Sequence, residues 1–146
     1  MNRRKLILLL LVAFMLSGSG TGLLAQDKSM AKHKFVLQLS DGGKMKQTLV
    51  LNVARNLIRH YGNDVHIEIV AFGPGLRLLF KSNGNRKRIS NLNQYGVRFS
   101  ACKNTIKGMG KKLGHPPVLN AKAVPVGAGV VRIYELVKKG YMLVRP

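Results

Sequence analysis

Segments of strand length alternate with helical patterns along most of this chain, and few folds accommodate that order. Apolar runs predict five strands, at 35–39, 65–72, 97–101, 122–126 and 141–144. Helical patterns separate them, at 46–61, 76–80, 87–95, a short stretch after 103, and 130–137. Gly62 and Gly140 are placed to end two of these helices. The pattern predicts an α/β fold whose mostly parallel five-stranded sheet is covered by helices on both faces.

The N-terminal segment has the organisation of a signal peptide. Arg3, Arg4 and Lys5 precede an apolar run at 6–16, and small residues lead to Ala25. The run is shorter than the roughly 20 residues that a membrane-spanning helix needs. We therefore expect a signal peptide over 1–25, a flexible lead-in over 26–33 and one domain over 34–146, in a periplasmic or secreted protein.

The chain is very basic, with 25 Lys and Arg against five Asp and Glu, a net charge of +20. Without residues 1–25, 22 basic and five acidic residues leave +17. Such a charge indicates an anionic partner, such as an acidic protein, an anionic membrane surface or a small oxyanion, or else a solubilising surface. Export and the absence of interleaved aromatic residues argue against nucleic acid.

No sequence motif indicates a metal or a cofactor. The histidines, at 33, 60, 66 and 115, lack ligand spacing apart from a weak pair formed by His66 and Glu68. The glycine segments 73–75 and 127–129 complete no nucleotide-binding motif and are interpreted as turns. We expect neither a metal nor a cofactor.

Cys102 is the only cysteine and follows the third predicted strand, directly before a helix. A helix N-terminus favours a thiolate, and Lys103 and Lys107 would add positive charge beside the sulfur. Ser100, Asn104 and Thr105 are close enough in sequence to support it with hydrogen bonds. The alternative is a buried cysteine that acts as a small apolar residue. Position alone leaves both interpretations open.

Two further loops should lie beside Cys102, because functional residues gather at the carboxyl ends of parallel strands. One contains Asp41, and the other consists of Gly73, Pro74 and Gly75. Asp41 is the one acidic residue that we place at this edge.

Four segments occur in order along the chain: FVLQLSD at 35–41, LNVARNL at 51–57, AFGPGL at 71–76 and GVRFSACKNT at 96–105. Together they resemble the DsrE/DsrF-like family of sulfur-relay proteins, in its small exported branch. The resemblance runs from about Lys34 to Pro146. It implies a three-layer α/β/α sandwich, a homo-oligomer such as a trimer or hexamer, and a cysteine, here Cys102, that can carry sulfur as a persulfide.

Three functional hypotheses follow. In the first, Cys102 holds sulfane sulfur or a related thiol adduct and passes it to a thiol-bearing partner, in the manner of a sulfurtransferase-like carrier. In the second, the chain is a non-catalytic basic module that binds an anionic ligand, membrane surface or acidic protein. In the third, it is an envelope redox sensor that forms an intermolecular disulfide through Cys102.

Overall fold

The computed structural model describes residues 30–146. The elements in chain order are β1 (His33–Leu39), α2 (Lys44–Tyr61), β2 (Val65–Ala71), the 3₁₀ helix η2 (Gly73–Leu79), α3 (Arg86–Gln94), β3 (Arg98–Cys102), α4 (Lys103–Leu113), β4 (Ala123–Val126), α5 (Gly129–Lys138) and β5 (Met142–Val144). The strand and helix order matches the sequence-based expectation, with end shifts of a few residues.

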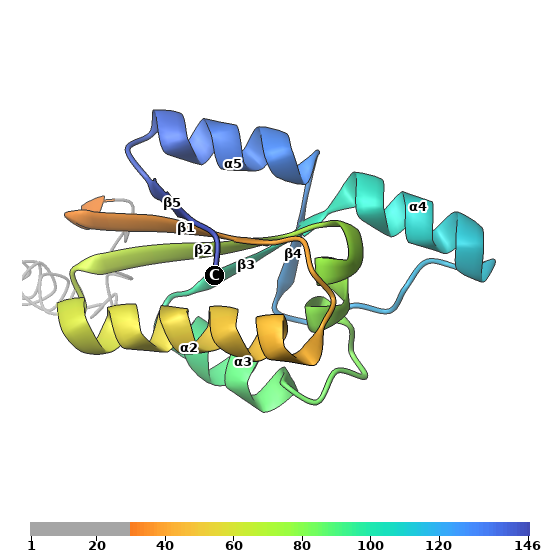
Figure 1. Cartoon of the computed structure of the whole chain (residues 1–146), viewed down its shortest axis with the longest axis horizontal. Coiled ribbons are helices and arrows are strands. Elements are labelled where there is room, and N and C mark those ends of the chain that lie inside the picture. The colour runs from red at the N-terminus through yellow and green to blue at the C-terminus, as the bar shows by residue number, and fades with distance from the viewer. Residues whose placement is uncertain (1–29) are drawn as a thin grey trace, which may run out of the picture.

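All neighbouring strands are parallel, in the order β4-β3-β2-β1-β5. Helices α2 and α3 cover one face of the sheet and α5 covers the other, while α4 extends beyond the sheet (Figure 1). The predicted α/β fold, a three-layer α/β/α sandwich, is therefore confirmed, and every pairing in the sheet is parallel. Because all strands run in one direction, the loops after β1, β2 and β3 lie at the same edge.

The face beneath α2 and α3 carries the larger hydrophobic core. Leu37, Ile69 and Phe99, from the three central strands, are fully buried there. Leu51 of α2 and Ile89 of α3 are fully buried against the same cluster. The apolar stripe of 46–61 thus packs inward as its spacing predicts.

The face beneath α5 has a smaller apolar cluster. Ile133 and Leu136 of α5 pack on Val36 and Val70 of the central strands, with Tyr141 beside them. The apolar stripe predicted within 130–137, on α5, is only partly buried against the sheet. Val130, Val131, Tyr134 and Val137 are between 43% and 63% exposed and form an apolar surface that we call the α5 outer face.

Several expected boundaries need correction. Strand β1 begins at His33, so the lead-in expected over 26–33 ends earlier. Cys102 is the last residue of β3 and does not follow it. Helix α4 begins at Lys103, with Cys102 at its N-cap position.

The expected signal peptide over 1–25, its cleavage after Ala25 and the first part of the lead-in lie outside the described residues. Within residues 30–146, no helix combines the length and the hydropathy needed to cross a bilayer.

A candidate functional site at Cys102

Two helix N-termini converge on the sulfur of Cys102. Cys102 pairs with Val126 at the end of β4, and α4 starts directly after it. Gly129, the first residue of α5, donates its backbone N–H to the Sγ atom at 3.2 Å. The backbone N–H of Lys103 donates to the carbonyl of Gly127 at 3.1 Å and ties the two helix starts together. Helix N-termini stabilise negative charge, so this position favours a thiolate.

Gly129 lets the start of α5 pack closely on Phe72. A Cβ atom at position 129 would lie 3.0 Å from the Cβ of Phe72. A larger residue would therefore require Phe72 or the start of α5 to shift. Gly129 was missed by the sequence analysis, which interpreted 127–129 as a plain turn.

Thr105 supports the sulfur from α4. Its hydroxyl lies close enough to the sulfur to favour the negative form of Cys102 and accepts a hydrogen bond from the N–H of Gly73 at 2.9 Å. The N–H groups of Asn104 and Thr105 make no strict capping bond to the sulfur, but they lie close enough to favour its negative form. The structure thus brings together Cys102, Asn104, Thr105 and Gly73.

Burial and hydrogen bonding act in opposite directions on the thiol. Cys102 is only 4% exposed, and this burial raises its pKa. The hydrogen bonds of Thr105, Gly129 and Asn104 outweigh burial, so the pKa of Cys102 lies below its ordinary value. The thiol is buried, as the alternative interpretation requires, but its polar environment favours the thiolate more than that of an ordinary cysteine.

The expected role of the lysines is not what the structure shows. The Lys103 and Lys107 side chains are exposed on α4, and none of the groups that lower the pKa of Cys102 is a lysine. Ser100 is also wrong as a partner of the sulfur, because its hydroxyl donates to Glu68 at 2.6 Å. Backbone amides and one hydroxyl thus stabilise the thiolate of Cys102, a role that we had expected of the lysine charges.

The remaining edge residues have structural roles. Asp41 accepts a hydrogen bond from the N–H of Gly43 at 2.6 Å and makes a tight turn after β1. Gly75 lets η2 approach β1, because a Cβ there would lie 2.2 Å from the carbonyl oxygen of Leu39. Gly73 has φ +51°, a conformation that favours glycine.

A buried carboxylate beneath α5 was only weakly indicated by the sequence. Glu68 accepts from Ser100 and from Nε and Nη2 of Arg132 at 2.8 and 2.7 Å, and Nε of Arg98 lies 3.7 Å away. Burial raises the pKa of Glu68, but the hydrogen bonds from Arg132 and Ser100 and the charges of both arginines outweigh burial, so this pKa lies below that of an ordinary glutamate. His66, which the sequence paired with Glu68, instead hydrogen-bonds the Tyr141 hydroxyl.

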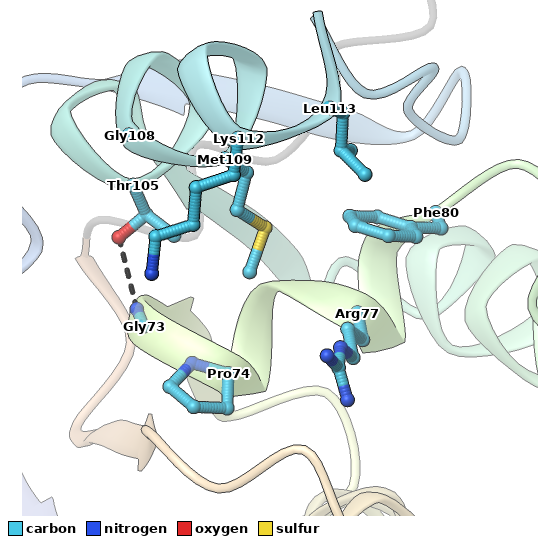
Figure 2. A pocket seen from close by; sticks show the side chains of 9 residues that line it. All are labelled: Gly73, Pro74, Arg77, Phe80, Thr105, Gly108, Met109, Lys112 and Leu113. Atoms are coloured by element: carbon cyan, nitrogen blue, oxygen red, sulfur yellow. Dashed lines mark hydrogen bonds between the residues drawn. The ribbon is translucent and has the colours of Figure 1, made fainter.

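A groove adjoins the site on the side of Thr105. It lies between η2 and α4, has a volume of about 440 Å³ and is lined by Gly73, Pro74 and Thr105 at one end (Figure 2). Cys102 does not line it. Over the described part of the chain, no group of three His, Cys, Asp or Glu side chains could hold a metal ion.

The chain is similar to a solved structure of a protein of unknown function, MTH1491 from Methanobacterium thermoautotrophicum. The two share 27% sequence identity, with a TM-score of 0.70 over 78% of this chain and 99% of that chain. No family model matches the chain, and no curated protein does. The similarity supports the fold and leaves the chemistry to be argued from the site.

Proposed function

We propose that this protein is a carrier that holds sulfane sulfur, or a related thiol adduct, on Cys102 and passes it to a partner thiol. One observation carries the proposal. Cys102 is at the N-cap position of α4, and its sulfur accepts a hydrogen bond from the N–H at the start of α5 at 3.2 Å. The resemblance of 96–105 to the DsrE/DsrF-like family supports it. An inert core cysteine would need no such polar surroundings.

The chemistry balances without an external oxidant. The Cys102 thiolate attacks the outer sulfur of a donor persulfide; the donor S–S bond breaks, a new S–S bond forms on Cys102, and the donor leaves as a thiolate. A partner thiolate then attacks the outer sulfur on Cys102, and Cys102 leaves as the thiolate again. The N–H of Gly129 and the hydroxyl of Thr105 stabilise the thiolate that leaves in this second step.

The acceptor must be another molecule. Cys102 is the only cysteine in the sequence, so no second thiol of the same chain can resolve the persulfide. Its burial, at 4% exposure, shields a bound persulfide from bulk thiols and favours a partner that docks at the strand edge. We also propose that the protein is exported and that its signal peptide is removed.

The direct test is mass spectrometry of the folded protein after incubation with a polysulfide. We expect one added sulfur on the peptide containing Cys102, removed by a small thiol once the protein is unfolded, and no added sulfur in the Cys102→Ser variant. Unmodified Cys102 at every polysulfide concentration, in protein whose thiol still titrates, contradicts the carrier function. The matched control is Ser100→Ala, which alters a neighbouring hydroxyl that does not contact the sulfur.

A basic binding module is the second candidate, and the exposed lysines of α4 favour it. Lys103, Lys107, Lys111 and Lys112 are all exposed, and none serves the sulfur. An acidic protein or an anionic membrane would bind such a surface with an affinity that falls steeply with salt. Anion binding that survives in Cys102→Ser, together with no sulfur uptake, would favour this function.

The homo-oligomer stays a proposal, and the α5 outer face is the surface that we assign to a second copy. It carries Val130, Val131, Tyr134 and Val137, all exposed. Four exposed apolar side chains on one short helix form a surface that a second copy could cover, and the opposite charges of the exposed Glu135 and Lys138 lie on the same helix.

A further inference from the structure

We propose that the groove between η2 and α4 binds a small organic anion that carries an aliphatic chain, of which a medium-chain carboxylate is the simplest example. The site does not depend on sulfur chemistry, because Cys102 does not line it. Its volume of about 440 Å³ lies within the range of small-molecule sites, roughly 300–1,000 Å³.

The interior of the groove suits an aliphatic chain. Phe80 at the end of η2 and Leu113 at the end of α4 line one end, and Met109 reaches into the space between the two helices (Figure 2). Leu113 is 54% exposed, so its side chain is available for contact with an occupant of the groove. The flexible Met109 thioether can adapt its shape to an occupant.

The charge around the groove selects an anion. Lys112 extends from α4 across the groove, and Arg77 lies on the η2 rim (Figure 2). None of the lining residues is acidic. An apolar cavity with cationic groups at its margin fits a molecule with an apolar body and a carboxylate end, because each part then has a matching partner.

Gly108 leaves the space for this occupant. It lines the groove from the middle of α4, and a Cβ built there meets no atom within 4 Å. A glycine inside a helix is unfavourable relative to most other residues, so Gly108 lowers the stability of α4. The open volume above Gly108 is where we place part of the aliphatic chain.

The test is isothermal titration calorimetry with octanoate, octanol and acetate on the full-length Cys102→Ser protein. We expect saturable one-to-one binding of octanoate, with octanol weaker because it lacks the charge and acetate weaker because it lacks the chain. Each added methylene should improve the dissociation constant by roughly two- to fourfold while the chain still fits. Equal binding of octanoate and acetate would overturn the proposal, because it would indicate a general anion surface.

Two variants locate the site. Gly108→Leu should fold, because leucine is a better helix former than glycine, and should lower octanoate affinity by roughly tenfold or more by filling the groove. Lys112→Met should weaken it by roughly two- to fivefold, whereas Lys111→Met, the same change at the preceding exposed lysine, should have a smaller effect. Full affinity in Gly108→Leu, or equal losses in the two lysine variants, would overturn the proposal. Persulfide formation by the wild-type protein is measured without octanoate, so this test and that of the carrier function can fail separately.

Discussion

The two faces of the sheet differ in how they hold their helices. Beneath α2 and α3, strands and helices meet through apolar side chains such as Leu37, Leu51 and Phe99. Beneath α5, a smaller apolar cluster lies beside the buried carboxylate of Glu68 with its arginine Arg132. The first face is stabilised by the burial and packing of apolar side chains. The second face is also stabilised by a charge network, and removing the arginine from this network leaves the carboxylate charge buried. The helix that carries an N–H to Cys102 is therefore held partly by polar contacts.

The largest expected effect comes from breaking the charge network. Arg132→Met leaves the Glu68 carboxylate, which is fully buried, with only Ser100 and the more distant Arg98. We expect the free energy of unfolding at neutral pH to fall by about 3 kcal/mol, because a buried carboxylate that loses its closest charged partner is costly. Urea denaturation measures this, with Lys138→Met on the same helix as the control. A loss no larger than that of Lys138→Met would contradict the account of this face.

The apolar face should respond to a cavity, and its response should not depend on pH. Leu51→Ala, at a fully buried position on α2, should cost about 2–3 kcal/mol. The difference between wild type and Arg132→Met should instead shrink as the pH falls. Because the folded pKa of Glu68 lies below that of an ordinary glutamate, its network stabilises the protein above the ordinary pKa and is lost as the pH drops through the folded value.

Urea denaturation of both variants between neutral and acidic pH compares the two faces. The free energy of unfolding of the wild-type protein should approach that of Arg132→Met at acidic pH. Its difference from that of Leu51→Ala should stay constant. Parallel curves for both variants would show that Glu68 does not contribute through its charge.

The smallest expected effect on stability lies on the α5 outer face. Tyr134 is 62% exposed, so Tyr134→Lys should change the free energy of unfolding by less than about 0.5 kcal/mol. If a second copy covers this face, the added charge should shift the sedimentation of the wild-type oligomer toward monomer. Met45→Lys, an equal change at an exposed residue of α2, should leave the assembly intact. Identical sedimentation of the two variants would rule out this face as the interface.

The sequence predicted the fold well because strands and helices have simple periodicities. The strand runs and the stripe of α2 matched the structure to within a few residues. The outer face of α5 could not be predicted, since Val130, Tyr134 and Val137 have the spacing of a buried stripe but point to solvent. Periodicity reveals an apolar face but does not say whether the same chain covers it.

The site was predicted only in part for a related reason. Position after a strand and before a helix was enough to select Cys102 and Thr105. The role of Gly129 depends on β4 lying beside β3, which brings the start of α5 to the sulfur. Lysine charge at helical spacing was a poor guide, because neighbours along α4 can point away from the residue that precedes the helix.

The most direct test of the account is the thiolate titration of Cys102, followed by ultraviolet absorbance as the wild-type spectrum minus that of Cys102→Ser. Absorbance reports ionisation at equilibrium, so the burial of the thiol does not limit it. We predict that the wild-type pKa of Cys102 lies below that of an ordinary cysteine and rises in Thr105→Val, which removes the hydroxyl but keeps the shape. Lys103→Met and Lys107→Met should have little effect. A wild-type pKa above the ordinary value, or a pKa that rises in the lysine variants and not in Thr105→Val, would contradict a thiolate stabilised by hydrogen bonds between two helix N-termini.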